Sequence, residues 1–314
     1  MLKNKKWIIL IALAIVFLGV YLWPVPSVPF EKTYEKVNPS QSQALHDFRI
    51  NHPVQNLNFK GENWEYVSFG KGEETILFLH GMTGAYDIWW NQMEALQDTY
   101  RVISVTYPAV DSLEEMSDGV LAILDAESVE KTNIVGTSLG GYLAQYMVAN
   151  HPDRVLAAVF SNTFPPNDLI AEKNRSIGMA LPFLPEWLVL DVLRGSFSES
   201  IYPASGKDEL TLAFLNEISY GRMRKAQVVG RFHGVVEKFT PPDVVALDIP
   251  VLIIEADNDP LVEPILREQL KETYPTAEVW TLSEVGHFPY LNFSEAYTNI
   301  LKSFFGNLVI IAPL

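Results

Sequence analysis

The stretch GTSLGG at residues 136–141 constrains the fold of this chain most. It follows the apolar run at residues 133–135, which predicts a strand, and it opens into an apolar run that predicts a helix. A serine at such a junction predicts a sharp, strained turn, because Gly136 and Gly140 remove the side chains that would collide there. The turn would lift the Ser138 hydroxyl clear of the sheet, where it could act as a nucleophile.

Candidate partners for this serine follow it in the order acid, then histidine. Residues 250–254 are apolar and predict a strand, which leads to the carboxylates Asp257 and Asp259. Residues 277–282 predict a further strand, and His287 follows it. A serine hydroxyl is a weak nucleophile at neutral pH and needs a base within hydrogen-bond reach. A histidine base held by a carboxylate would supply that chemistry.

On these residues the chain resembles the α/β-hydrolase family, whose members carry a G-x-S-x-G elbow and the same order of partners. The resemblance to the family covers about residues 57–305. A closer resemblance, to maspardin-like members of the family, is limited to residues 136–145 and 274–291. It implies Asp259 as the acid by alignment on Asp-Pro, with Asp257 as the alternative. Ala256 stands where the family commonly has glycine, which is a mild departure.

Two backbone N–H groups are expected to form an oxyanion hole. Leu139 opens the helix after the serine, so its N–H lies at a helix N-terminus and can donate to an anion. The resemblance places the second donor at Met82, in the loop HGMTG that follows a strand predicted at residues 75–79. It also implies that His80 shapes this loop through its side chain.

The alternation of strands and helices predicts a mainly parallel, doubly wound sheet, and continuous apolar runs fit strands covered on both faces. The stretch at residues 167–247 breaks this alternation and is too long for an ordinary connection. The resemblance implies that it is a helical lid inserted after the sixth strand. The expected organisation is a signal anchor at 1–23, a linker and pre-helix at 24–52, the hydrolase core at 53–166, the lid at 167–247 and the rest of the core at 248–314.

The N-terminus predicts a transmembrane helix. Three lysines precede residues 7–23, which carry no charge and are near the lower limit of about 17 residues for a spanning helix. Bulky residues before Pro24 favour an uncleaved anchor over a cleaved signal peptide. The lysines should stay in the cytoplasm, so a single-pass protein of the cell membrane would carry its catalytic domain on the extracytoplasmic side. Cleavage of the segment would make the protein secreted.

Composition excludes several other classes of function. The chain has no cysteine, so neither disulfides nor thiol catalysis are possible. Its net charge of −15 argues against binding nucleic acid. No metal-ligand spacing, phosphate loop or dinucleotide fingerprint occurs in the sequence, so we expect no metal and no cofactor.

Two local features leave alternatives open. Trp89 and Trp90 suggest an apolar acyl site, or they pack against the sheet. A basic cluster in the lid predicts a solvated helix face, with binding of an anionic substrate group as the alternative. Its members are Arg222, Arg224, Lys225 and Arg231.

The sequence therefore predicts a membrane-anchored serine hydrolase with Ser138, His287 and Asp259 as its catalytic triad. The expected reaction is cleavage of a small-molecule ester or acyl substrate through an acyl-enzyme intermediate. Amidases, peptidases, thioesterases, carbon–carbon hydrolases and acyltransferases use the same triad, so the sequence does not separate them. The alternative is a non-catalytic, membrane-tethered binding protein that keeps the hydrolase fold.

Overall fold

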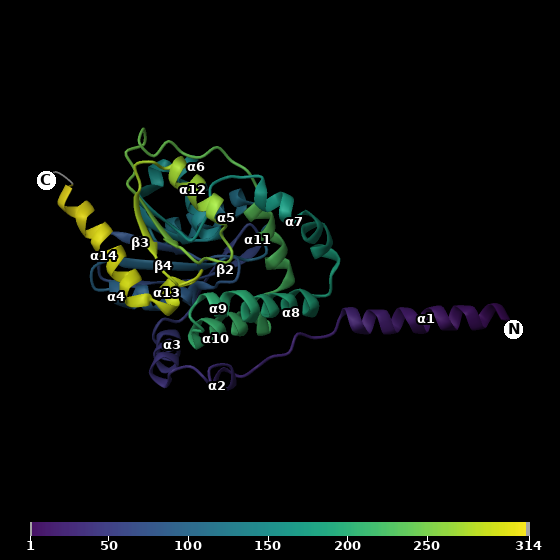
Figure 1. Ribbon diagram of the computed structural model, residues 1–314. Helices are drawn as coiled ribbons and strands as arrows, with labels where there is room; N and C mark the ends of the chain where they lie inside the picture. The colour runs from purple at the N-terminus through teal and green to yellow at the C-terminus, as the bar shows by residue number, and fades with distance from the viewer. Residues whose placement is uncertain (1, 312–314) are drawn as a thin grey trace.

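A mixed sheet of eight strands forms the centre of the fold, in the order β1-β2-β4-β3-β5-β6-β7-β8 (Figure 1). The computed structural model describes residues 2–311. β1 and β2 are antiparallel to their neighbours, and the strands from β4 to β8 pair in parallel. The strands are β1 (Gln55–Phe59), β2 (Glu62–Gly70), β3 (Thr75–Leu79), β4 (Arg101–Thr106), β5 (Thr132–Thr137), β6 (Val155–Ser161), β7 (Val251–Ala256) and β8 (Glu278–Leu282).

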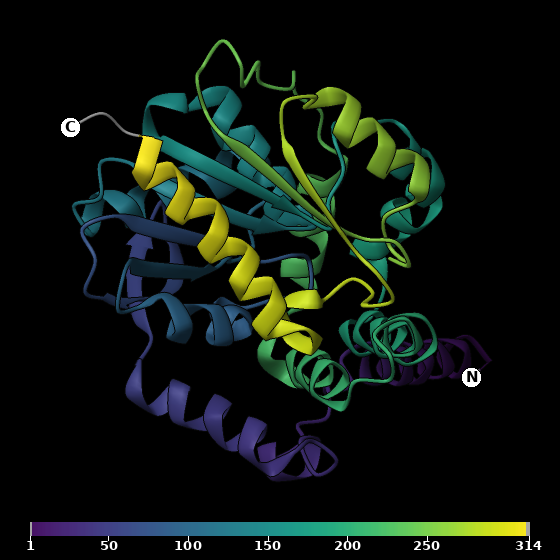
Figure 2. The same cartoon turned by 60° about the vertical axis from the view of Figure 1, so that its left-hand side comes forward.

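Helices cover both faces of this sheet, as the continuous apolar runs in its strands predict. Every residue of β3 is buried, and successive side chains enter different cores because strand side chains alternate between faces. Ile76 and Phe78 pack in the core under α3, α4 and α14, whereas Leu77 and Leu79 pack in the core under α5, α6 and α12. Figure 2 shows α14 crossing the first of these faces. These helices are α3 (Pro39–Asn51), α4 (Trp90–Leu96), α5 (Leu113–Ala126), α6 (Leu139–Asn150), α12 (Pro264–Thr273) and α14 (Ser294–Ile311).

Short helices link the larger elements. They are α2 (Phe30–Thr33), η1 (Tyr86–Trp89), η2 (Pro152–Arg154) and α13 (Pro289–Asn292). Between β6 and β7 the chain forms a helical insertion, residues 169–236, which contacts α6 through its last helix. The insertion contains α7 (Leu169–Ala180), η3 (Leu181–Phe183), α8 (Glu186–Ser196), η4 (Phe197–Ile201), α9 (Tyr202–Ala204), α10 (Glu209–Glu217), η5 (Ile218–Arg222) and α11 (Lys225–Val236).

The N-terminal helix α1 (Leu2–Tyr21) projects from the rest of the fold (Figure 1). Its side chains at residues 6–20 are exposed. The prediction of a transmembrane helix is wrong: within residues 2–311, no helix combines the length and the apolar character needed to cross a bilayer. The part of α1 after its lysines, from Trp7 to Tyr21, rises only about 22 Å at about 1.5 Å per residue. A hydrocarbon core is about 30 Å thick. The predicted location of the catalytic domain, on the extracytoplasmic side of the cell membrane, is a separate statement that no observation here tests, and it stays a prediction.

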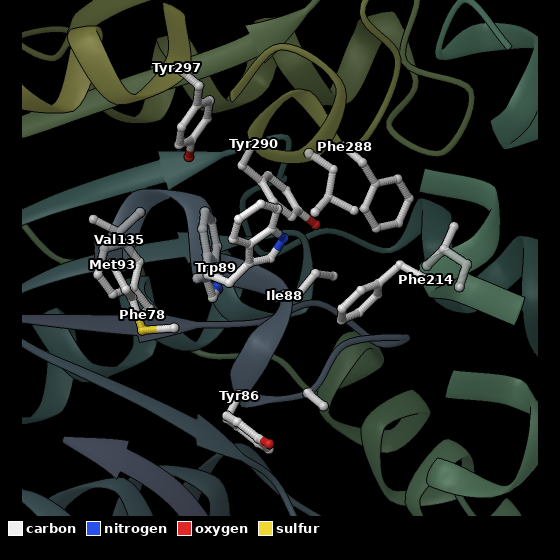
Figure 3. Close-up of a cluster of buried hydrophobic side chains, with 14 of the residues drawn as sticks. Phe78, Tyr86, Ile88, Trp89, Met93, Val135, Phe214, Phe288, Tyr290 and Tyr297 are labelled. Carbon is white, nitrogen blue, oxygen red and sulfur yellow. The ribbon is translucent and has the colours of Figure 1, made fainter. Parts of the chain in front are cut away.

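The aromatic pair after the third strand belongs to the core. Trp89 is fully buried, with its ring centroid 4.3 Å from that of Tyr290 and 5.3 Å from that of Phe78 (Figure 3). Trp90 is buried as well. Packing against the sheet, one of the two alternatives for this pair, therefore accounts for both tryptophans.

A buried ionic cluster joins α3 to η1 and to the insertion; we call it the Asp87 cluster, after its fully buried carboxylate. Arg49 Nε donates to Asp87 Oδ2 at 2.7 Å, and Arg222 Nη2 donates to Asp87 Oδ1 at 2.9 Å. Arg49 also binds Glu217 with both terminal nitrogens, at 2.9 and 2.7 Å, and the Tyr34 hydroxyl donates to Glu217 at 2.7 Å. The cluster thus fixes the N-terminal helices against the insertion, and Arg222 does not lie on a solvated helix face as predicted.

Opposing effects set the protonation of this cluster. Burial alone would raise the pKa of Asp87, but the charges of Arg222 and Arg49 and their hydrogen bonds outweigh it and leave the pKa below its ordinary value. Asp87 is therefore ionised at neutral pH. The two carboxylates then balance the two guanidinium groups, which is what allows these charges to be buried together.

Candidate active site

Ser138 lies in the turn between β5 and α6, in a strained backbone conformation with φ 53° and ψ −122°. The turn is possible because of two glycines. A Cβ on Gly136 would lie 2.2 Å from the carbonyl oxygen of Gly140, and a Cβ on Gly140 would lie 2.1 Å from the carbonyl oxygen of Leu79. The Ser138 N–H donates to the Ser161 carbonyl at 3.0 Å, which ties the turn to β6. The serine is thereby held at the carboxyl end of the central strands.

The carboxylate that lies against His287 is Asp259, which follows β7 and is buried. Asp259 Oδ2 is 2.7 Å from His287 Nδ1, and Oδ1 accepts hydrogen bonds from the N–H groups of Leu261 at 2.8 Å and Val262 at 3.1 Å. Burial alone would raise the pKa of Asp259, but His287 and these hydrogen bonds outweigh it and leave the pKa below its ordinary value. An ionised carboxylate can only accept, so Nδ1 of His287 carries the proton and Nε2 is free to act as a base.

Asp257, the alternative acid, lies elsewhere. It is exposed, and its Oδ1 accepts from the N–H of Glu284 at 2.9 Å. This hydrogen bond supports the loop that leads to His287, but within residues 2–311 the carboxylate that is hydrogen-bonded to the imidazole ring belongs to Asp259 and not to Asp257. The structure therefore brings Asp259, and not Asp257, to the histidine.

Sequence reasoning missed Asn162, which supports the acid. Its Nδ2 donates to Asp259 Oδ2 at 2.8 Å, so this oxygen is bound on two sides. Asn162 directly follows β6 and has a positive φ of 41°. An amide does not replace the carboxylate of a triad, but the place of Asn162 at a strand end was a signal for a supporting hydrogen-bond donor.

Ser138 and His287 line the same cavity, but among the described residues no hydrogen bond joins the Ser138 hydroxyl to the His287 ring. Catalytic hydrogen bonds of this kind are often long in a free enzyme and shorten when substrate binds. The cavity has a volume of about 430 Å³ and extends under the helical insertion. This volume lies within the range of small-molecule sites, about 300–1,000 Å³.

The loop after β3 lies against the serine. A Cβ on Gly81 would be 3.0 Å from Ser138 Cβ, and Met82 lines the cavity. Leu139 is the first residue of α6, so its N–H has no partner within the helix. Both positions predicted for the oxyanion hole therefore lie beside Ser138.

His80 holds this loop through its ring. His80 Nδ1 lies 2.6 Å from the Gly81 carbonyl oxygen, and the Tyr107 N–H donates to His80 Nε2 at 3.4 Å. Burial, together with the charge of Arg231, leaves the pKa of His80 well below its ordinary value. The ring is therefore neutral, with its proton on Nδ1, and its role is to shape the loop rather than to exchange protons.

Arg231, from α11, fixes the same loop from the other side. It is buried, and its Nη1 donates to the carbonyl oxygens of Met82 at 2.7 Å and Gly84 at 3.1 Å, while Nη2 donates to that of Tyr107 at 3.0 Å. Burial lowers the pKa of Arg231 to about 10, so it still carries its charge at neutral pH. The prediction of a solvated face is wrong for this residue, because its charge is satisfied by backbone carbonyls rather than by water.

Within residues 2–311, no three side chains of the metal-binding types come together as a possible ion site. The groups that the site brings together are the hydroxyl of Ser138, the imidazole of His287 and the carboxylate of Asp259. A hydroxyl on a strained turn, a histidine oriented by a carboxylate and two nearby N–H groups can support nucleophilic acyl transfer.

Comparison with known proteins agrees with this geometry. Residues 74–293 match the family described as alpha/beta hydrolase fold, and the chain belongs to that family. It is 26% identical over 220 residues to maspardin from Danio rerio, which covers 69% of each chain. It is 22% identical over 265 residues to a pimeloyl-[acyl-carrier protein] methyl ester esterase from Neisseria meningitidis serogroup B, which covers 76% of this chain and 96% of the relative.

Solved structures give the same fold. A hydrolase from Pseudomonas aeruginosa PA01 superposes with a TM-score of 0.71 at 20% identity, covering 81% of this chain and 98% of the other. The predicted α/β-hydrolase fold and the likeness to maspardin are thus confirmed. The fold and these relatives support a hydrolase.

Proposed function

We propose that this protein is a serine hydrolase that cleaves a carboxylic ester through an acyl-enzyme intermediate. The observation that carries the proposal is the hydrogen bond between His287 Nδ1 and Asp259 Oδ2, 2.7 Å apart, on the same cavity as the strained Ser138. The esterase relative, whose name describes a methyl ester as substrate, adds support for ester chemistry. A small-molecule substrate fits the size of the cavity.

Each side chain has one role in the proposed reaction. His287 Nε2 takes the proton of Ser138 as the hydroxyl oxygen attacks the ester carbonyl, and the N–H groups of Leu139 and Met82 bind the oxyanion that forms. His287 then gives this proton to the leaving alcohol. A water molecule next attacks the acyl-enzyme and gives a proton to His287, and the acid is released as His287 returns the proton to Ser138. Asp259 stays ionised throughout and stabilises the imidazolium.

Replacement of the nucleophile tests this proposal. Ser138→Ala should lower kcat on p-nitrophenyl butyrate by about a thousandfold or more. Ser200→Ala is a matched control, because Ser200 is exposed on the insertion and should leave kcat unchanged. Equal turnover by wild type and Ser138→Ala would overturn the serine mechanism. An absence of turnover in all three proteins would favour a binding protein with a hydrolase fold.

A further inference from the structure

The cavity at Ser138 is walled by the helical insertion, and most of this wall is aliphatic or aromatic. The side chains that decide its character are Ile177, Leu181, Val189, Val192, Val228 and Phe232, from α7, η3, α8 and α11. Such a wall gives an apolar group a favourable transfer from water, of about 0.8 kcal/mol for each buried methylene. The polar side chains that the insertion adds to the wall are Lys173, Asn174 and Ser196, so it offers few directional contacts to a polar substrate.

The ionisable side chains at the cavity do not indicate an ionic substrate. Lys173 and Glu263 line it, but they form an ion pair with each other, with Lys173 exposed and Glu263 half-buried. Burial raises the pKa of Tyr290, so its phenol stays neutral. Arg231 is not in the wall, and its guanidinium is bound to backbone carbonyls. The alternative that the basic cluster binds an anionic substrate group therefore has no support here.

The cavity wall reaches the surface of the insertion at two residues. Ile177 on α7 and Val192 on α8 both line the cavity, yet they are 46% and 53% exposed. Met179 and Phe183 lie close in sequence to Ile177 and are 65% and 78% exposed. An apolar chain that extended from the serine would lie against apolar side chains as far as Ile177 and Val192.

The length of the wall limits the length of such a chain. Along α7, cavity-lining residues run from Ile170 to Ile177, which is about 10 Å at about 1.5 Å per residue. With carbon–carbon bonds of about 1.5 Å, an extended chain of that length holds about eight carbons.

Building on the proposed ester hydrolysis, we infer that the substrate is a neutral ester with an apolar chain of medium length, lying along α7 from Ser138 to Ile177 and Val192. The chain can belong to the acyl part or to the alcohol part of the ester. Ester hydrolysis then joins water to the acyl carbon and releases the alcohol, with no further reactant. Val192, at the end of the chain, is the residue that sets the preferred length.

Two series of esters on the full-length protein test this inference. One is p-nitrophenyl alkanoates, with the chain on the acyl side, and the other is acetates of linear alcohols, with the chain on the alcohol side. We expect kcat/KM in one of the two series to rise by about fourfold per methylene and to peak near eight carbons. Val192→Glu should lower the ratio of kcat/KM for the eight-carbon substrate to that for the two-carbon substrate by about tenfold or more, since it places a carboxylate beside the end of the chain.

Val245→Glu is the matched control. Val245 is 62% exposed and is not part of the cavity wall, so its substitution should leave both values of kcat/KM unchanged. Val192 is exposed as well, so folding is not at risk in either variant. Turnover of short esters with no gain from chain length, or an unchanged ratio in Val192→Glu, would overturn this inference and leave the proposed function intact. Failure of wild type to cleave any ester would overturn the proposed function and this inference with it.

Discussion

Substitution of Asp87 by asparagine should destabilise the protein strongly, although the residue takes no part in the proposed chemistry. Asp87 is fully buried and accepts hydrogen bonds from Arg49 at 2.7 Å and Arg222 at 2.9 Å. In the wild type two carboxylates balance two guanidinium groups, whereas Asp87→Asn leaves a buried net charge of one. Removing one partner of a buried ion pair costs about 3–5 kcal/mol. That is a large part of the total stability of a domain, which is about 5–15 kcal/mol.

Urea unfolding followed by tryptophan fluorescence measures this effect. With an m value of about 3 kcal/mol per molar, the midpoint should fall by about 1–1.7 M. Asp98→Asn is the control, because Asp98 makes an exposed ion pair with Lys71 and should leave the midpoint unchanged. A loss below about 1 kcal/mol in Asp87→Asn would refute the reasoning, since it would place the cluster in the range of exposed ion pairs.

The same reasoning predicts how the contribution of Asp87 to the unfolding free energy depends on pH. The folded-state pKa of Asp87 lies below its ordinary value of 3.8, so the stability that its carboxylate contributes is fully present above that pH. It disappears as the pH falls through the lower folded-state pKa. The difference in unfolding free energy between wild type and Asp87→Asn should therefore be constant at neutral pH and narrow only below about pH 4.

Substitutions at three further residues test the site through steady-state kinetics. Asp259→Asn should lower kcat by about a thousandfold to ten-thousandfold, because an amide does not hold the proton on His287 Nδ1; unchanged kcat would mean that another group orients the ring. Gly81→Ala should lower kcat/KM by about tenfold or more, since its Cβ would lie 3.0 Å from Ser138 Cβ; full activity would show that the loop shifts freely. Arg231→Met should lower kcat more than it changes KM, and Arg231→Lys should restore only part of the loss, because one ammonium does not span three carbonyls; unchanged kcat in Arg231→Met would remove its positioning role.

The parts of the site that follow strands could be predicted from the sequence. Ser138, Asp259 and His287 each come shortly after an apolar run that forms β5, β7 or β8, and parallel strands bring their carboxyl ends to one edge of a sheet. Sequence spacing alone therefore places these three residues near one another. The choice of Asp259 over Asp257 depended on the Asp-Pro alignment, and only the side-chain geometry separates the two.

Residues whose partners are distant in sequence could not be predicted in this way. Arg231 and Arg222 appear as one basic cluster in the sequence, but one binds the carbonyls around Gly84 and the other binds Asp87. Their burial depends on how the insertion folds back over the loop after β3, which no local pattern shows. The transmembrane prediction also failed because composition does not show where a helix ends. Residues 7–23 carry no charge, but the helix α1 ends at Tyr21.

The most direct test of the central claim is covalent labelling of Ser138 by a fluorophosphonate probe. Such a probe reacts rapidly only with a serine that is activated by a base and lies beside an oxyanion hole, which binds the oxygen of the probe. For the full-length protein we expect one adduct per chain by intact mass, mapped to Ser138 by peptide analysis, and none on folded Ser138→Ala. A wild-type protein that is folded but takes up no probe, or that is labelled equally in Ser138→Ala, would contradict the account of this protein as a serine hydrolase.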